Sequence, residues 1–206
     1  MRVAIVGGTF DPFHRGHLEP VLAAREQMRW DRIVYMPAFR QPFKADREHA
    51  SGHHRFAMAV LATYDREGLY VSDLELERGE ISYTVDTLEQ LRESDPTSVI
   101  DWVIGDDNVA ALLEWKSVGR ILELANFAVL QRKSVTTVPH VLQDRLVEPG
   151  AAKTSGAIAF VHNEMVPVSS TEVRRKVRAG EPVDAEVGDR VARYIQRYGL
   201  YREGQW

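Results

Sequence analysis

The fold of this chain is decided by the stretch RVAIVGGTFDPFHRGHLEPVLAAREQM, residues 2–28. Its apolar start predicts a short buried strand, the pair Gly7 and Gly8 a tight turn, and the remainder a helix that carries His14 and His17 near its first turn. Glycine lets a ligand approach the backbone, and a helix start offers unpaired N–H groups and the positive end of its dipole. His14 and His17 are three positions apart and share one helical face. The stretch therefore predicts a phosphate site with two imidazoles directed at one bound group.

The length and composition place limits on the class of protein. The chain has 206 residues, of which 44% are hydrophobic and 27% charged, and we expect one globular domain over residues 1–206. A formal net charge of −4 and a pI near 6.0 argue against general binding of nucleic acid or membrane surfaces. An anionic ligand must therefore be held by local positive groups.

Cysteine usage and hydropathy indicate the compartment. The chain contains no cysteine, which excludes disulfides, thiol catalysis and thiolate metal sites and fits a reducing compartment. No apolar run approaches the roughly 20 residues of a membrane span, and the first one is too short for a signal peptide. We expect a soluble, cytoplasmic protein.

Strand-like and helix-like segments alternate along the chain. Strands are expected near residues 3–6, 32–38, 69–71, 99–105, 126–132 and 157–162. Helices are expected near residues 14–28, 55–64, 84–94, 111–125 (one or two short ones), 168–180 and 187–198. Residues 73–80 are expected to form an exposed charged edge, and residues 133–156 show no clear period.

This alternation predicts an α/β fold with a doubly wound, mostly parallel sheet and helices at the C-terminal end. Ligands of such sheets bind beyond the carboxyl ends of the strands, where the strand order reverses. Four polar loops follow predicted strands, at residues 7–17, 39–44, 105–108 and 167–171. We expect them to converge on one crevice.

Simpler interpretations compete with a phosphate site. GGTFDPFHRGH is neither a GxGxxG nor a GxxxxGK[ST] fingerprint, and an isolated HxxH is more often a tight turn with Asp11 or His14 capping the helix. The density of Gly, Thr, Asp, Pro and His in so few residues favours the phosphate site.

A second anion site is predicted at VSSTEVR, residues 168–174. Ser169 and Glu172 have capping-box spacing, so a helix begins there, with Ser170, Thr171 and Arg174 near its start. The alternative is an ordinary capped basic surface helix. Single cations elsewhere, such as Lys44 and Arg132, are more often solvated side chains.

Four stretches together resemble one family. GTFDPFHRGH is similar to the signature of class I nucleotidyltransferases, whose HxGH histidines contact the phosphates of ATP. SYTVDTL from Ser82, IGDDN from Ile104 and VSSTEVR from Val168 narrow the resemblance to the bacterial nicotinate-nucleotide adenylyltransferases. The resemblance spans residues 1 to about 200 and implies a Rossmann-like nucleotidyltransferase fold.

The resemblance also implies roles for particular residues. His14 and His17 are the expected catalytic residues, with His17 acting chiefly on the α-phosphate. The expected ATP-binding residues are Gly8, Thr9, Phe10, His14, His17, Gly105, Asp107, Ser170, Thr171 and Arg174. The expected residues for nicotinate mononucleotide are Lys44, Tyr83, Thr84, Trp115 and Arg132. In the loop QPFK, Phe43 replaces the usual histidine, which affects the expected contacts to the mononucleotide phosphate.

Physical arguments bear on three of these roles. N–H groups at Tyr83 and Thr84 can hold a carboxylate at a helix start, and the indole of Trp115 can stack on an electron-poor ring. The alternatives are a plain N-cap at Thr84 and a core aromatic at Trp115. We expect Asp107 to hold ribose hydroxyls and Asp106 to be in solvent or a supporting role, although an Asp pair can also bind Mg²⁺.

The implied reaction joins ATP and nicotinate mononucleotide into deamido-NAD and pyrophosphate. Mg²⁺ is expected to arrive with ATP and no protein metal site is expected. The alternatives are a nicotinamide mononucleotide or phosphopantetheine acceptor, or a nucleotide-binding regulator without turnover. The sequence leaves the oligomeric state open, a homo-oligomer included, and predicts no nucleic-acid or membrane partner.

Overall fold

The computed structural model describes residues 1–42, 50–131, 137–164 and 166–202. The strands are β1 (Arg2–Gly8), β2 (Arg32–Pro37), β3 (Leu69–Val71), β4 (Val99–Gly105), β5 (Asn126–Leu130), β6 (Leu146–Val147) and β7 (Ile158–Val161). The α-helices are α1 (Arg15–Met28), α2 (Gly52–Thr63), α3 (Leu74–Arg78), α4 (Thr84–Ser94), α5 (Val118–Leu124), α6 (Ser170–Arg178), α7 (Asp184–Val187) and α8 (Asp189–Arg197). Short 3₁₀ turns are η2 (Asp106–Asn108), η3 (Leu112–Glu114) and η4 (His140–Arg145).

The strands form one seven-stranded parallel sheet in the order β3-β2-β1-β4-β5-β7-β6. In this register, Val3 of β1 lies opposite Arg32 of β2 on one side and opposite Ile100 of β4 on the other. The chain therefore moves outward from β1 to β3 and then returns to place β4 beside β1. The predicted doubly wound sheet is confirmed, with its switch point between β1 and β4.

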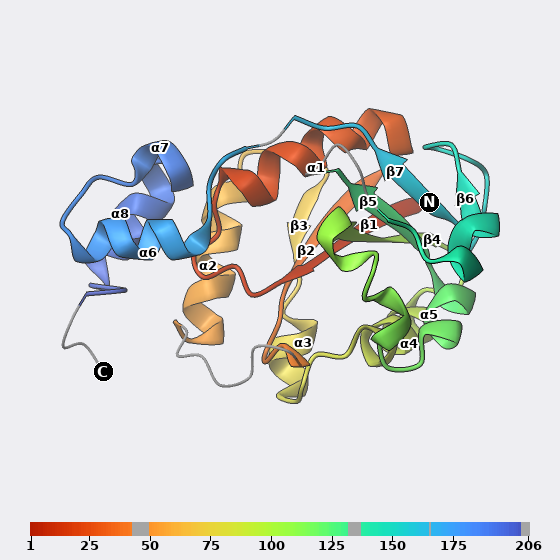
Figure 1. The fold of residues 1–206 in the computed structure, drawn as a ribbon. Helices are drawn as coiled ribbons and strands as arrows, with labels where there is room; N and C mark the ends of the chain where they lie inside the picture. The colour runs from red at the N-terminus through yellow and green to blue at the C-terminus, as the bar shows by residue number, and fades with distance from the viewer. Residues whose placement is uncertain (43–49, 132–136, 165, 203–206) are drawn as a thin grey trace.

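Alternate residues of β1 face two different apolar layers. Ala4 and Val6 belong to the core that α1, α2 and α8 cover, whereas Val3 and Ile5 belong to the core under α4 and α5. Figure 1 shows α1 on one side of the sheet and α4 and α5 on the other. The sheet is thus buried on both faces, as its continuous apolar strands require.

Helices α6, α7 and α8 gather at one end of the molecule, beyond α2 (Figure 1). The hydroxyl of Tyr194 on α8 lies 2.9 Å from Nδ1 of His54 on α2. Helix α6 begins as predicted, since Ser169 Oγ accepts from the N–H of Glu172 at 3.2 Å. The reciprocal half of the predicted capping box is wrong, because the Glu172 carboxylate pairs with Arg175 at 2.9 Å instead.

Two regions differ from the sequence-based expectation. Residues 73–80, expected to form an exposed edge, contain α3. Glu75 in this helix is only 3% exposed, and its carboxylate accepts from the hydroxyl of Thr87 of α4 at 2.7 Å. The aperiodic connection between residues 133 and 156 contains η4 and the edge strand β6. No helix in the described part of the chain is both long and apolar enough to span a membrane.

A buried polar network joins the amino ends of the central strands. Asp101 of β4 is fully buried and accepts from Arg2 at 2.5 and 3.1 Å. It also accepts from Trp30 Nε1 at 2.7 Å and from Asn126 Nδ2 at 3.1 Å. A buried charge persists only when it is paired, so this network fixes β1, β4 and β5 against one another at the end opposite the loop of residues 9–14.

Candidate active site

The loop of residues 9–14, the phosphate loop, leaves β1 and leads into α1. His14 is the N-cap of α1, in an extended conformation, and its N–H donates to Nδ1 of His17 at 3.2 Å. The two rings stack with centroids 3.7 Å apart and planes inclined by 23°. Because Nδ1 of His17 accepts, the proton of the neutral ring is on Nε2, which can donate to a phosphate oxygen. The two rings lie side by side, and their shared contact with one bound group stays a prediction.

The ring of Phe10 packs against the ring of His17. Its ring is 3% exposed and meets the ring of His17 edge-on, with centroids 5.0 Å apart. Its backbone is left-handed, at φ 53°, which is uncommon for a bulky residue and persists only where the surroundings hold it. An ATP contact at Phe10 would therefore involve the backbone, since the ring is part of the core.

Two glycines allow the close approaches that build the loop. A Cβ on Gly8 would lie 2.7 Å from the ring of Phe10. A Cβ on Gly16 would lie 3.0 Å from the ring of His14 and 3.3 Å from the carbonyl oxygen of Val168. Gly16 therefore lets α1 lie against the segment that enters α6.

Helix α6 is attached to the phosphate loop at its start. Ser170 Oγ donates to the carbonyl of Pro12 at 3.1 Å, and Arg174 Nη1 donates to the carbonyl of Asp11 at 2.5 Å. Arg174 Nη2 also donates to Thr171 Oγ1 at 3.3 Å. The structure thus brings together two of the predicted ATP-binding blocks, which are about 160 positions apart in the sequence.

A buried arginine attaches the loop after β2 to the same place. Arg55 is 3% exposed and donates to the carbonyls of Thr9 at 2.8 Å, Ala50 at 3.0 Å and Phe39 at 3.4 Å. Burial lowers the pKa of its guanidinium, an effect that the charge of Asp11 opposes. The sequence analysis missed Arg55, although a lone arginine beginning the apolar run RFAMAVLA was the signal that could have identified it.

The carboxyl end of β4 lies beside that of β1. A Cβ on Gly7 would lie 3.0 Å from the ring of Trp102, so the indole packs against the backbone of β1 just before the phosphate loop. After Gly105, the side chain of Asp107 is exposed and that of Asp106 is 3% exposed. The exposure of Asp107 fits its predicted ribose contact. Asp106 was expected in solvent or in a supporting role, and its burial excludes the solvent position, whereas the supporting role stays a prediction.

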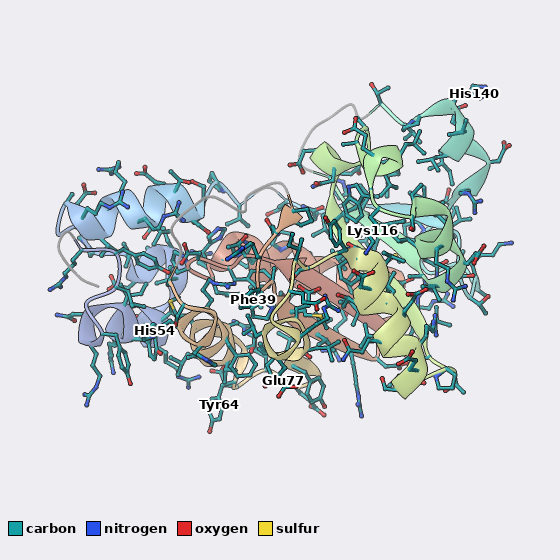
Figure 2. The ribbon with its side chains drawn as sticks, turned by 90° about the horizontal axis from the view of Figure 1, so that it is seen from below. Phe39, His54, Tyr64, Glu77, Lys116 and His140 are labelled. Carbon is teal, nitrogen blue, oxygen red and sulfur yellow. The ribbon has the colours of Figure 1, made fainter. Side chains whose placement is uncertain are left out.

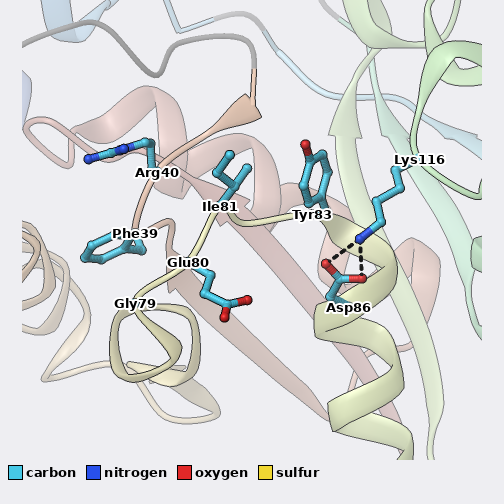
Figure 3. Close-up of a pocket in the computed structure, with 8 residues that line it drawn as sticks. All are labelled: Phe39, Arg40, Gly79, Glu80, Ile81, Tyr83, Asp86 and Lys116. Atoms are coloured by element: carbon cyan, nitrogen blue, oxygen red, sulfur yellow. Dashed lines mark hydrogen bonds and ion pairs between the residues drawn. The ribbon is translucent and has the colours of Figure 1, made fainter.

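A cavity of about 440 Å³ lies near the start of α4 (Figure 3). Its lining residues are Phe39, Arg40, Gly79, Glu80, Ile81, Tyr83, Asp86 and Lys116. Its wall is held together by a hydrogen bond from Ser82 N–H to the Arg40 carbonyl at 2.8 Å. In the view of Figure 2, Phe39 lies between His54 and Lys116.

Two cations, two carboxylates and two aromatic rings line this cavity. Lys116 Nζ lies 4.5 Å from the ring centroid of Tyr83 and 2.9 Å from both carboxylate oxygens of Asp86. Arg40 is exposed at the opposite part of the wall. The sequence analysis missed Lys116 and Arg40, because an isolated lysine or arginine carries no local signal.

Of the predicted acceptor residues that the structure describes, Tyr83 lines this cavity. Tyr83, not Thr84, is the N-cap of α4, and the N–H of Tyr83 already donates to the Ile81 carbonyl at 3.0 Å. The first-turn N–H groups of Thr84 and Val85 have no carbonyl partner within the helix and are the better placed donors for a carboxylate. Among the described residues, the cavity wall includes Tyr83 but neither Thr84 nor Trp115.

Trp115 combines a core contact with partial exposure. Its ring meets Phe127 edge-on, with centroids 6.0 Å apart, and packs against the apolar layer under α4 and α5. It precedes Lys116, so the stretch that carries it borders the cavity. Lys44 and Arg132, also predicted to contact the mononucleotide, lie outside the described residues.

The donor set of the described residues bears on metal binding. In residues 1–42, 50–131, 137–164 and 166–202 there is no group of three or more His, Asp or Glu side chains that could hold a metal ion. Mg²⁺ in nucleotide sites is typically held by one or two carboxylates, substrate phosphates and water.

Sequence comparisons identify the family. The cytidylyltransferase-like family model matches residues 5–176. A probable nicotinate-nucleotide adenylyltransferase of Gemmatimonas aurantiaca is 38% identical over 98% of this chain and 93% of the relative. A protein of the same name from Herpetosiphon aurantiacus is 37% identical over 97% of this chain and 98% of the relative.

Solved structures agree on the fold. The nicotinic acid mononucleotide adenylyltransferase of Plasmodium falciparum, complexed with NaAD, superposes with a TM-score of 0.74 over 97% of both chains at 20% identity. A putative nicotinate-nucleotide adenylyltransferase from Vibrio parahaemolyticus gives 0.68 at 19% identity, over 98% of this chain and 97% of the other. Together with the parallel sheet and the loop that carries His14 and His17, these findings show that the chain belongs to the cytidylyltransferase-like family and, within it, to the nicotinate-nucleotide adenylyltransferases.

Proposed function

We propose that the chain transfers the adenylyl group of ATP to nicotinate mononucleotide, a step of NAD biosynthesis. The observation that carries the proposal is the meeting of α1 and α6 at one loop. Ser170 and Arg174 donate to the carbonyls of the loop whose far end presents His14 and His17. The starts of two helices, the two histidines and Arg174 thus lie at one loop, an arrangement that suits a triphosphate in a protein of net charge −4.

The reaction needs positioning more than acid–base chemistry. A phosphate oxygen of the mononucleotide attacks the α-phosphorus of ATP, the bond from that phosphorus to the bridging oxygen breaks, and pyrophosphate leaves with the electron pair. The nucleophile is already an anion at neutral pH, so no general base is required. Catalysis then consists of aligning two mutually repelling anions and stabilising charge on the α-phosphate and leaving oxygen.

The chain's own residues divide this task. His17 Nε2–H is assigned to the α-phosphate, where charge develops, and His14 with Thr9 holds the triphosphate. Ser170, Thr171 and Arg174 meet the phosphates from the side of α6. Gly105 and Asp107 contact the adenosine ribose. When bound, Mg²⁺ neutralises phosphate charge, and it is brought by ATP.

The cavity beside α4 is assigned to the acceptor. The N–H groups that begin α4 would favour a carboxylate over a carboxamide, whose NH₂ would face donors. Lys116 lies nearby but is paired with Asp86, so the helix start carries this preference. Trp115, Lys44 and Arg132 complete the proposed contacts to the ring and the mononucleotide phosphate. The relatives at 37–38% identity, which are named as nicotinate-nucleotide enzymes, support this assignment.

The test compares kcat/KM for nicotinate and nicotinamide mononucleotide with ATP, measured by pyrophosphate release and by chromatography of the dinucleotide. We expect the acid to be preferred by at least about tenfold, the equivalent of one lost favourable contact. Equal values would overturn the acceptor site. Turnover with phosphopantetheine alone would assign a different acceptor, and ATP binding without turnover on any acceptor would indicate a regulator.

A further inference from the structure

Tyr201 turns back from the end of α8 toward the phosphate loop. Its hydroxyl donates to Asp11 Oδ1 at 2.7 Å. Its backbone is left-handed, at φ 67°, and the preceding Leu200 N–H donates to the Ile195 carbonyl at 3.0 Å. A left-handed tyrosine is sparsely populated and is maintained by its surroundings, so the contact is a built feature of the fold.

Asp11 is the point at which several segments meet. Its side chain is 2% exposed, and Oδ1 also accepts from the N–H of Ala50 at 3.1 Å. Arg174 Nη1 lies 3.7 Å from Oδ2 while donating to the carbonyl of the same residue. A carboxylate can be buried only when it is paired and hydrogen-bonded, so each of these donors contributes to holding Asp11.

The hydroxyl of Tyr201 is a dependable donor. Burial first, and then the negative charge of Asp11, raise the pKa of Tyr201, so the hydroxyl keeps its proton at neutral pH. Tyr201 also packs against the apolar core that includes Phe10 and Phe13. The hydroxyl therefore contacts the phosphate loop directly, and the ring packs against the core to which two aromatic residues of that loop belong.

The chain on both sides of Asp11 is held by residues that surround the proposed ATP site. Thr9 is held through its carbonyl by Arg55, and Pro12 is held through its carbonyl by Ser170. Asp11 lies between them, and its own carbonyl receives Arg174. A shift of Asp11 would move Thr9, His14 and Arg174 together.

We propose that Asp11 and Tyr201 are positioning residues for adenylyl transfer: the Tyr201–Asp11 hydrogen bond fixes the phosphate loop and Arg174 in the arrangement that binds the triphosphate. This inference rests on the proposed function. It assigns a role in the active site to Tyr201, in the segment after α8, through its contact with Asp11.

The first experiment compares Tyr201→Phe with Tyr198→Phe, which removes the same hydroxyl from a ring that is 51% exposed. Well below the Tm of each variant, Tyr201→Phe should lower kcat/KM for ATP about tenfold, since displacements of about 1 Å can cost up to about 100-fold. KM for the mononucleotide should stay within about twofold in both variants, and kcat/KM for ATP should do so in Tyr198→Phe. A general loss of stability would instead raise both KM values or neither.

The second experiment is a double-mutant cycle with Asp11→Ala. Once Asp11 is removed, the further change Tyr201→Phe should alter kcat/KM for ATP by less than about twofold, because the two residues act through one hydrogen bond. Multiplicative effects would refute the coupling. If Asp11→Ala does not fold, amide exchange decides: the peptide covering residues 9–14 should exchange faster in Tyr201→Phe than in Tyr198→Phe.

These outcomes separate the inference from the proposed function. An active wild type with Tyr201→Phe equal to Tyr198→Phe in kcat/KM and in exchange overturns the inference and leaves the function standing. The opposite case is also distinct. If the wild type forms no dinucleotide, the proposed function is overturned. If Tyr201→Phe, but not Tyr198→Phe, then still shows faster amide exchange and weaker ATP binding, the positioning role stands.

Discussion

Removing Asp101 should destabilise the protein without changing its chemistry. The carboxylate is fully buried and receives Arg2, Trp30 Nε1 and Asn126 Nδ2 at distances of 2.5 to 3.1 Å. Asp101→Asn keeps the shape and one acceptor oxygen but leaves the guanidinium of Arg2 without its counter-charge. Asp101→Ala also leaves Trp30 Nε1 without its acceptor and removes one of the two acceptors of Asn126 Nδ2, which still donates to the Lys153 carbonyl at 3.1 Å.

The magnitudes follow from this geometry. Breaking a buried ion pair costs about 3–5 kcal/mol, and the side chain of Arg2 is 15% exposed, so we expect about 3 kcal/mol for Asp101→Asn. Each unpaired buried donor costs about 1–3 kcal/mol, which raises the expectation for Asp101→Ala to about 5 kcal/mol. At roughly 2–4 °C per kcal/mol for a chain of this size, Tm should fall by about 6–12 °C and about 10–20 °C.

Thermal unfolding followed by circular dichroism measures the loss of stability. Steady-state kinetics well below Tm tests whether the chemistry is unchanged. The control is Asp31→Asn, which also alters a contact to Arg2 but at an exposed carboxylate that accepts its backbone N–H at 2.6 Å. It should cost less than about 1 kcal/mol. Equal falls in Tm for Asp31→Asn and Asp101→Ala would refute the reasoning, as would a large fall in kcat for Asp101→Asn below its Tm.

Three further predictions concern the site and its surroundings. His17→Ala should lower kcat by about 100-fold or more with a small change in the Kd for ATP, because one donor to the transition state is lost; an unchanged kcat would reject the role. Trp115→Ala should raise KM for the mononucleotide about tenfold, and Trp115→Phe should restore most of it, if the ring stacks as proposed; equal KM values for Trp115→Ala and wild type would leave only its core contact. Burial raises the pKa of the Glu75 carboxyl above its usual value of 4.5, so the folded state favours the protonated form. The contribution of Glu75 to stability is therefore present below pH 4.5 and is lost as the pH rises through the raised pKa. The Tm of wild type should fall relative to the Tm of Glu75→Gln as pH increases, and parallel plots of Tm against pH would contradict this.

The sequence was most informative where local chemistry decides structure. The β1–loop–α1 unit follows from an apolar run, two glycines and a helical period, and the start of α6 follows from Ser169 as its N-cap. Alternation of strands and helices then leads to the parallel sheet. Helix α3 was missed because five residues with two glutamates in the first turn carry no clear period, and the burial of Glu75 depends on Thr87 of another helix.

The supporting residues of the site could not be predicted in this way. Arg55 meets Thr9 across 46 positions, and Tyr201 meets Asp11 across 190. Their partners are defined only once the tertiary contacts form. The apolar run after Arg55 could indicate that this arginine is buried, but not which carbonyls it meets, and Tyr201 has no comparable local signal. The cavity beside α4 likewise depends on the bridge between Arg40 and Ile81, which no local sequence rule predicts.

The hydrogen bond between Ser170 and Pro12 has a consequence for biosynthesis of the protein. It joins residues 158 positions apart, and the contact from Tyr201 to Asp11 spans still more of the chain. A ribosome adds about 5–20 residues per second, so β1 and α1 are made many seconds before their partners emerge. During that interval the nascent chain has the histidines but not the second wall of the triphosphate site, and it should acquire affinity for ATP only after α6 has docked.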